Sequence, residues 1–498
     1  MRTRQPAIRA AVLAILSSLP GLAPAAWAGP LQEDLQARRA RVMERIGSDA
    51  LAIFWSAPTR VYSLDVDYEY RQDSNLLYLT GIDQEETILV LMPGNRTRKE
   101  VLFIRPADRR REHWTGHSLT PTEATALSGV PTVLTLDQFE PFVAAMFSGR
   151  AIGDDPSEHE RFFEALRAGR ARLALLLEPL RDLSTPPGPA RRFAADLLQR
   201  FFGFTVEDTT PVLADLRQIK TAWEQDVMRR SVAVSIEAHK AAMRAAAPGR
   251  FEYEVEAALE EVYLLNGAMS WSYPSIVGSG PNATILHYTR SGRRMASGDL
   301  LLIDAAANYQ GYTGDITRTY PVTGRFSREQ RDIYEIVLAA QEAGMKAARA
   351  GNRPADVQAA CDEVLRAGLV RLGLVTEPTG QQFKIWSTHG VLHWIGMDVH
   401  DVGSGERPLA PGMTFVIEPG IYIRQAALDA LPRTPENLAF IERVQPAVRR
   451  YLDIGVRIED SFLLTGTGLE RLSAGVPRTI DEIERFMART TGTKPDSR

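Results

Sequence analysis

The segment spanning residues 184–189 constrains the fold most strongly, because three prolines and one glycine within six positions exclude regular secondary structure. A chain of 498 residues is too long for one ordinary core, so we expect more than one domain. The proline-rich segment is either a linker or a loop just before one. We therefore predict an amino-terminal domain over 31–183, a linker region with a helix over 184–209, a carboxyl-terminal domain over 210–487 and a flexible tail over 488–498.

Residues 31–183 alternate between β-like and helix-like runs. The runs 50–55, 75–79, 87–92 and 100–104 are rich in Ile, Leu, Val, Phe and Tyr, which favours strands. A helix is expected over 190–201. The pattern predicts an α/β amino-terminal domain.

The remainder of the chain reads as two similar halves. Helix-like stretches at 222–247 and 252–266 precede a strand-rich block at 273–322, and stretches at 328–350 and 355–372 precede a second block at 389–465. This order predicts an α+β carboxyl-terminal domain with pseudo-twofold symmetry.

The first 28 residues have the composition of a signal peptide. Three arginines lie within the first nine positions, residues 10–22 are mostly apolar, and residues 26–28 show the small-x-small pattern of a cleavage site. An uncleaved anchor is disfavoured, because Pro20 and Pro24 interrupt a segment already near the minimum length for spanning a membrane. We expect cleavage after Ala28 and a periplasmic or secreted protein, with no stable membrane insertion.

Overall charge excludes some partners. The net charge of -4 and the pI near 6.1 give no electrostatic basis for binding nucleic acid. The single cysteine, Cys361, rules out an intramolecular disulfide framework and is expected to be buried. The sequence does not determine the oligomeric state, and it is compatible with a homo-oligomer.

Asp304 and Asp315 are the first candidate pair. Residues 308–311 between them have turn character, and a symmetric hairpin would place the two aspartates directly opposite each other. Opposed carboxylates destabilise an apolar sheet unless a cation lies between them. The alternative is a slipped register with one aspartate in solvent.

A histidine cluster and two further acids are also candidates. His389, His393 and His400 are three of only eight histidines and fall within twelve positions. Glu418 and Glu459 end or interrupt β-like runs, where a buried acid needs a partner. Clustering alone does not show which histidine binds a metal.

Together these residues resemble a known pattern. The pita-bread dinuclear metallopeptidases have the same order of residues, namely two aspartates eleven positions apart, then His, Glu and Glu. The resemblance spans about 210–487. By that resemblance the metal ligands are Asp304, Asp315, His393, Glu418 and Glu459, with Asp315 and Glu459 bridging two ions.

Within this superfamily the chain is most similar to the aminopeptidase P branch. The phrases at 276–280 and 286–289, the phrase 314–319 and the pair His393-Trp394 resemble that branch. The amino-terminal phrases 70–75 and 78–81 resemble its amino-terminal module. One departure is a separation of about 40 residues between the two glutamates, which includes 424–453.

The resemblance implies release of the first residue from peptides with proline at position 2, by attack of a hydroxide that bridges the two ions. Glu418 would take the proton. His287, His389 and His400 would bind the substrate carbonyl or carry a proton to the leaving proline nitrogen, and Arg457 would hold outer carboxylate oxygens. Four carboxylates and one imidazole suit Mn²⁺, our expected metal, better than a structural zinc, and zinc, cobalt or iron are the alternatives.

Other interpretations share parts of this pattern. A prolidase has the same ligands but accepts only Xaa-Pro dipeptides, a creatinase-like enzyme shares the fold without the metals, and a non-catalytic peptide-binding protein could use the same fold. Trp394 favours longer peptides over dipeptides, because an aromatic wall beyond the proline could accept a continuing backbone.

Overall fold

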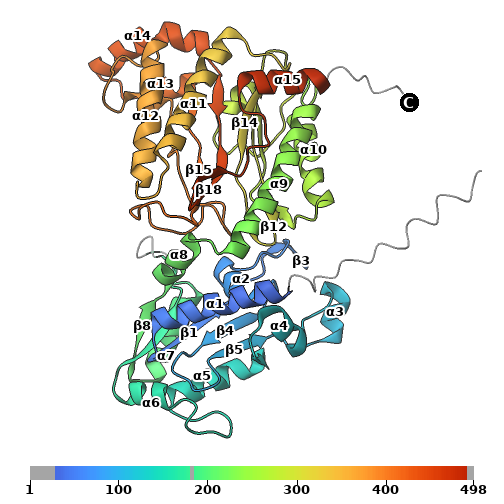
Figure 1. Ribbon diagram of the computed structural model, residues 1–498, viewed down its shortest axis with the longest axis vertical. Coiled ribbons are helices and arrows are strands. Elements are labelled where there is room, and N and C mark those ends of the chain that lie inside the picture. Colours follow the sequence, from blue (N-terminus) through green and yellow to red (C-terminus); the bar gives the residue numbers. More distant parts are fainter. Residues whose placement is uncertain (1–27, 180–183, 185, 491–498) are drawn as a thin grey trace, which may run out of the picture. The chain divides into compact units, whose positions relative to one another are not determined.

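The computed structural model describes residues 28–179, 184 and 186–490, and its contacts divide the chain into two compact units that separate between Thr209 and Thr210 (Figure 1). The predicted signal peptide, apart from its last residue, lies outside the described residues. The predicted tail begins too early, since the last helix, α15, runs Ile480–Thr490, and residues 491–498 are not described.

The amino-terminal unit is an α/β domain on a six-stranded mixed sheet. Its strand order is β6-β5-β4-β1-β7-β8, where β1 is Ala50–Trp55, β4 Thr87–Leu91, β5 Glu100–Ile104, β6 Thr132–Thr135, β7 Ala171–Leu175 and β8 Phe204–Asp208. One face packs on α5 (Phe139–Phe147), α6 (Glu160–Arg167) and α7 (Pro189–Arg200). Helices α1 (Ala28–Ile46), α2 (Ser74–Thr80), α3 (Arg109–Thr115) and α4 (Pro121–Ser128) and the small hairpin β2 (Val61–Ser63) and β3 (Val66–Asp67) complete the unit.

Two predictions about this unit were wrong. The stretch 75–79 is helical, because the Asp73 carboxylate caps the backbone N–H groups of Asn75 and Leu76 and Gly81 ends the helix in the left-handed region, at φ 66°. The predicted linker 184–209 does contain a helix, α7, but its last strand, β8, pairs in parallel with β7. That segment therefore belongs to the amino-terminal unit.

The carboxyl-terminal unit contains the two predicted halves. The first has helices α8 (Thr210–Gln218), α9 (Ala222–Ala245) and α10 (Glu252–Leu265), then β9 (Ser270–Trp271), β10 (Ile276–Ser279), β11 (Leu300–Asp304), β12 (Ala307–Tyr309), β13 (Tyr312–Thr313) and β14 (Thr317–Pro321). The second has α11 (Arg328–Ala347) and α12 (Pro354–Arg371), then β15 (Thr414–Ile417), β16 (Gly420–Tyr422), β17 (Gly455–Arg457), β18 (Asp460–Thr465) and β19 (Gly468–Arg471). Short sheets from both halves share one large core with the helices.

Several hydrogen bonds join the halves, and two of them lie beside the acidic candidates. The Glu459 N–H donates to the carbonyl of Thr317 in β14 at 3.1 Å, which forms an isolated β-bridge. The Arg457 N–H of β17 donates to the Thr319 hydroxyl at 3.2 Å. The strand ends that carry the acidic candidates therefore meet at the junction of the two halves.

The second predicted strand block, 389–465, is interrupted by helices. α13 (Gln425–Asp429) and α14 (Pro435–Tyr451) fill the long separation between the two glutamates, and Tyr451 donates a hydrogen bond to Asp332 of α11 at 2.9 Å. Residues 389–400 form a loop with one isolated bridge, from Trp394 to Phe415.

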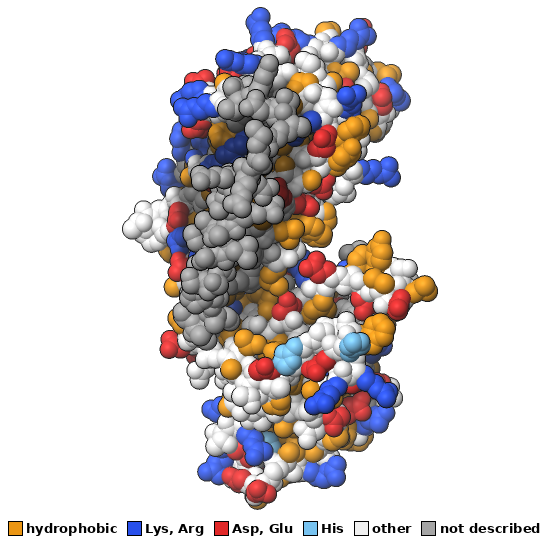
Figure 2. Space-filling model, turned by 90° about the vertical axis from the view of Figure 1, so that its right-hand side faces the viewer, with side chains coloured by type: hydrophobic (Ala, Val, Ile, Leu, Met, Phe, Trp, Pro, Cys, Tyr) orange, Lys and Arg blue, Asp and Glu red, His pale blue; other side chains and the backbone are white. Residues whose placement is uncertain are grey.

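The burial of the single cysteine and the distribution of surface charge agree with what the sequence predicts. Cys361 is buried, as predicted, and burial raises the pKa of its thiol to about 12. Cationic and anionic side chains intermingle on the face drawn in Figure 2, as the small net charge leads one to expect. Within the described ranges, every helix is too short or too polar to cross a bilayer.

Candidate metal centre

A cavity of about 400 Å³ in the carboxyl-terminal unit gathers every candidate site residue predicted from the sequence. Its lining consists of Leu286, His287, Asp304, Asp315, His389, Gly390, Leu392, His393, His400, Glu418, Arg457 and Glu459. Both halves contribute, since the two aspartates come from the first strand block and the two glutamates from the second.

The hairpin that carries the aspartates differs from the predicted symmetric one. Asp304 pairs with Thr317, not with Asp315, so the aspartates lie diagonally. The turn is centred on Gln310 and Gly311, whose φ angles of 52° and 80° suit a tight type I′ hairpin, and this choice of turn shifts the register. Neither aspartate faces solvent, as the slipped-register alternative would require, because both are at most 8% exposed.

Tyr273 holds the two aspartates together. Its hydroxyl lies 2.5 Å from one oxygen of Asp304 and 2.5 Å from one oxygen of Asp315. Burial, and then the charge of Asp304, raise the pKa of Tyr273 well above its ordinary value, so the group stays a hydrogen-bond donor. Sequence reasoning missed this residue, whose only signal is its position just before β10, the strand that pairs with the Asp304 strand.

Arg457 neutralises one of these acids. Its guanidinium donates to Asp304 at 2.6 Å, to the Thr317 hydroxyl at 3.1 Å and to the Tyr422 hydroxyl at 2.8 Å. Burial alone would raise the pKa of Asp304, but the Arg457 charge and the hydrogen bonds from Tyr273 and Arg457 together outweigh burial, so the pKa is lowered. For Asp315, burial and then the charge of Glu459 raise the pKa well above the usual range.

The Nε2 atom of His393 lies among the carboxylates, with its lone pair available to a metal ion. Its Nδ1 lies 3.1 Å from the Trp394 carbonyl oxygen, and its Nε2 lies 3.5 Å from Asp315, 3.6 Å from Glu418 and 3.7 Å from Glu459. Burial, and then the nearby His400, lower the pKa of His393 to about 4, so the ring is neutral. A neutral ring with Nδ1–H on a backbone carbonyl points the Nε2 lone pair at the acids, which is how a metal-ligating histidine is oriented.

Glu459 is buried and Glu418 is half-buried, and both have few hydrogen-bond donors. Glu459 accepts one hydrogen bond, from the Thr317 hydroxyl at 2.7 Å, and its other oxygen has no partner among the described residues. Burial and then Asp304 raise the pKa of Glu459 to about 8, and burial and then Glu459 raise that of Glu418 well above its usual value. Acids in such surroundings need protons or a cation.

The donor set fits divalent metal ions. Asp315, His393 and Glu459 each offer a ligand atom, all within 4.8 Å of one another. The unpartnered Glu459 oxygen and the Nε2 lone pair converge on that space, and a cation there would satisfy both. Oxygen and imidazole donors suit Mn²⁺ and related ions.

Three more histidines border the centre. His389 lies with Nε2 2.7 Å from the Tyr422 hydroxyl and Nδ1 3.5 Å from Glu418. The ring of His400 stands edge-on to that of His393, with centroids 4.5 Å apart. Burial and then His287 lower the pKa of His400, and both side chains line the cavity.

Trp394 and the segment 424–453 do not line the cavity. Trp394 is only 6% exposed and packs edge-on against Phe415 in the core, so it does not form the aromatic wall predicted from the sequence. The 424–453 segment packs on the outside through α14 and α11, where Arg450 also lies 3.3 Å from Glu329.

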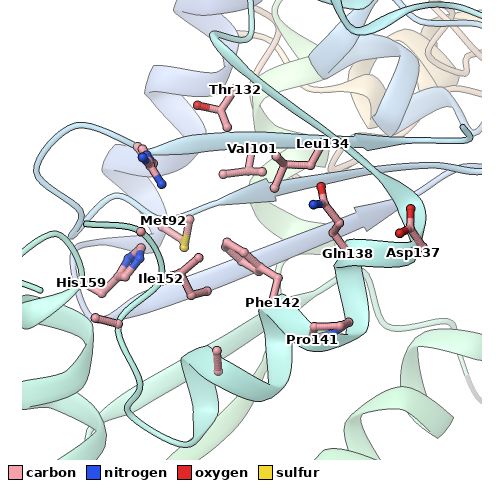
Figure 3. A pocket seen from close by; sticks show the side chains of 14 residues that line it. Met92, Val101, Thr132, Leu134, Asp137, Gln138, Pro141, Phe142, Ile152 and His159 are labelled. Carbon is pink, nitrogen blue, oxygen red and sulfur yellow. The ribbon is translucent and has the colours of Figure 1, made fainter. Parts of the chain in front are cut away.

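The amino-terminal unit has a larger cavity, of about 660 Å³, but its chemistry is different (Figure 3). Side chains such as Val101, Leu134, Phe142 and Ile152 line it, with His159 at one end and Asp137 at the other. Within the described part of the chain, the one cluster of three potential metal ligands lies in the carboxyl-terminal unit.

This fold and this centre define a metallopeptidase, and comparison with known proteins identifies the family. Residues 226–466 match the model of metallopeptidase family M24, and residues 35–152 match that of the aminopeptidase P amino-terminal domain. The chain belongs to the M24 metallopeptidases, and the predicted resemblance and fold class are confirmed.

Individual relatives narrow the likeness to aminopeptidase P. The chain is 34% identical over 466 residues to the Xaa-Pro aminopeptidase of Escherichia coli K12, covering 92% of this chain and 98% of the relative. It is also similar to the structure of E. coli aminopeptidase P with the inhibitor Pro-Leu, at a TM-score of 0.78 and 32% identity over 93% of this chain and 99% of that one. A zinc-substituted E. coli aminopeptidase P in complex with product matches with a TM-score of 0.76 and 32% identity, over 92% and 98% of the two chains.

Proposed function

We propose that this metallo-hydrolase is an Xaa-Pro aminopeptidase, which releases the first residue of peptides with proline at position 2. The observation that carries the proposal is the convergence of Asp304, Asp315, His393, Glu418 and Glu459 on one cavity in a chain that matches aminopeptidase P over nearly its full length. The intact ligand set argues against a creatinase-like enzyme and against a peptide-binding protein without catalysis.

These five residues would hold two divalent ions, and we propose Mn²⁺ because four of the five side chains are carboxylates. When bound, such ions lower the pKa of a water molecule and polarise the scissile carbonyl. Asp315, Glu418 and Glu459 each have an oxygen directed toward His393 Nε2, at 3.5, 3.6 and 3.7 Å, so these side chains would hold the ions together with His393.

The remaining side chains would handle the substrate and its protons. Glu418 accepts a proton at its carboxylate, with His389 Nδ1 3.5 Å away. The proline nitrogen belongs to a tertiary amide without an N–H and must gain a proton to leave. His287 and His400, on the lining of the cavity, would bind the carbonyl or supply that proton.

The cavity favours an aminopeptidase over a prolidase. A prolidase must bind the carboxylate of the proline, which calls for a cationic or donor-rich wall. Among the described residues that line the cavity, Arg457 is the only lysine or arginine, and its guanidinium is already bonded to Asp304, Thr317 and Tyr422. A longer Xaa-Pro-Yaa peptide carries its carboxylate past this region.

Hydrolysis of matched peptides tests the proposal. Xaa-Pro-Yaa and Xaa-Pro should be compared with Xaa-Ala-Yaa as control, on chelated protein and after addition of Mn²⁺. We expect activity only with metal, release of the first residue alone, and a higher kcat/KM for Xaa-Pro-Yaa than for Xaa-Pro. Preference for the dipeptide would replace the proposal with a prolidase, and no hydrolysis by metal-loaded protein would remove it.

We also propose that the protein is exported, with Gly29 as the first residue of the mature chain. The support is the basic, apolar and small-residue pattern of residues 1–28. Amino-terminal sequencing of protein from fractionated host cells tests this, and an intact Met1 on cytoplasmic protein would contradict it.

A further inference from the structure

The loop that carries His287 into the cavity is folded around one buried carboxylate, that of Glu252. Glu252 is the first residue of α10 and has no exposed surface. It does not line the cavity, whereas Leu286 and His287 do. The loop leaves β10 after Ser279 and reaches β11 at Leu300.

The Glu252 carboxylate accepts hydrogen bonds from both sides of the loop. One oxygen accepts from the Ser279 N–H at 2.6 Å, the Ser279 hydroxyl at 2.7 Å and the Asn282 amide at 3.1 Å, all before His287 in the chain. Its second oxygen accepts from the Tyr288 hydroxyl at 2.9 Å and the Arg293 N–H at 2.8 Å, both after it. The loop is therefore closed on itself through a single side chain.

The start of helix α10 holds the same loop through its backbone. The first N–H groups of a helix have no acceptor within the helix. Here the Glu252 N–H donates to the Arg293 carbonyl at 3.0 Å, and the Tyr253 N–H donates to the Ser291 carbonyl at 2.8 Å. Ser291 has a positive φ of 45°, uncommon for a residue other than glycine, so the surrounding contacts must hold this conformation.

We propose that Glu252 and Tyr288 are positioning residues that fix the His287 imidazole in the cavity. Tyr288 is the next residue in the chain, and its hydroxyl also accepts from the Gly292 N–H at 3.2 Å, so it connects the His287 segment to the far end of the loop. The inference rests on the proposed function, because it requires His287 to act on the substrate. Neither positioning residue needs to touch substrate or metal.

A double-mutant cycle separates this role from a merely structural one. Tyr288→Phe, His287→Ala and the double variant are compared as full-length, Mn²⁺-loaded protein on Xaa-Pro-Yaa. Misplacing a catalytic group by about 1 Å costs up to roughly 100-fold, so we expect Tyr288→Phe to lower kcat/KM roughly 10- to 100-fold with metal content unchanged. In the His287→Ala background the same substitution should change kcat/KM by less than about two-fold.

Tyr451→Phe is the matched control. Tyr451 also donates to a carboxylate at 2.9 Å, that of Asp332, but lies on α14 and does not line the cavity. Its variant should keep full kcat/KM. Glu252→Gln, which replaces one acceptor oxygen by a donor, should reproduce or exceed the Tyr288→Phe loss and show the same dependence on His287.

Hydrogen exchange supplies a readout that does not depend on the substrate. Amides of residues 280–293 should exchange faster in Tyr288→Phe than in the wild type, and those near Asp332 should not. Unchanged exchange, wild-type kcat/KM, loss of metal, or an equal loss in both backgrounds of the cycle would each overturn the inference. If wild-type protein cleaves no Xaa-Pro peptide, the proposed function fails, and exchange alone still decides whether Tyr288 holds the loop.

Discussion

In metal-free protein, the free energy of unfolding of the carboxyl-terminal unit should fall as the pH rises from 6.5 to about 8. The reason is the pKa of Glu459, which burial and then Asp304 raise from 4.5 to about 8 in the metal-free fold. Between those values the folded protein keeps a proton that the unfolded chain has released. Stability falls with rising pH wherever the folded state binds more protons, and the contribution of Glu459 levels off above about pH 8.

The size of the effect follows from one carboxyl group. Each retained proton costs about 1.4 kcal/mol per pH unit, so Glu459 alone removes about 2 kcal/mol across this interval. For a unit of this size that lowers the Tm by roughly 4–8 °C. The interval begins at 6.5 because below it buried neutral histidines act in the opposite direction, such as His393, whose pKa burial and then His400 lower from 6.5 to about 4.

Thermal unfolding of chelated protein between pH 6.5 and 8 tests this, with Glu459→Gln as the informative variant. A glutamine does not titrate, so the decline with pH should be flatter in the variant by about 1.4 kcal/mol per pH unit. Glu484→Gln is the control: burial raises the pKa of Glu484, but the Phe326 N–H, Arg331 and Arg325 together outweigh burial and lower the pKa, so the group is charged throughout the interval. Parallel curves for wild type and Glu459→Gln would refute the reasoning.

Three further predictions concern the centre itself. Asp315→Asn should lose both bound metal and turnover, because the variant replaces a charged carboxylate in the ligand cluster by a neutral amide; metal analysis giving two ions per chain in the variant would contradict this. Tyr273→Phe should weaken metal binding roughly 10- to 100-fold, since its hydroxyl orients one oxygen each of Asp304 and Asp315, and a competitive chelator titration measures it. His400→Ala and His287→Ala should each lower kcat by roughly 100-fold with metal content retained, as expected for groups acting on the substrate; metal loss equal to that of a ligand variant would reassign them.

Sequence reasoning found the acids and histidines because their types and order in the chain carry information. It failed where geometry depends on local backbone. The opposed pairing of Asp304 and Asp315 assumed a symmetric hairpin, whereas the turn formed at Gln310 and Gly311, the positions that adopt positive φ. Tyr273 is invisible in the sequence because a lone tyrosine beside a proline has no distinguishing pattern.

The sequence also failed to predict which apolar side chains are buried and in which kind of element. Trp394 next to His393 suggests a binding wall, but neighbours along an irregular loop can face different ways, and this ring packs against Phe415. The amino-terminal stretch 75–79 shows the same limit. Its apolar residues suit a buried strand or a buried helix equally well, and the Asp73 cap decided for the helix.

The centre exists only when the two halves of the carboxyl-terminal unit are joined. Asp304 and Asp315 come from the first half, His393, Glu418 and Glu459 from the second, and contacts between the halves pass through the same groups. Thr317 Oγ1 donates to Glu459, and Arg457 donates to Asp304. A ligand that binds only the joined arrangement stabilises it by mass action. Metal binding would therefore stabilise the junction. Without metal, Asp315, Glu418 and Glu459 must keep protons or repel one another across it, whereas Arg457 balances the charge of Asp304.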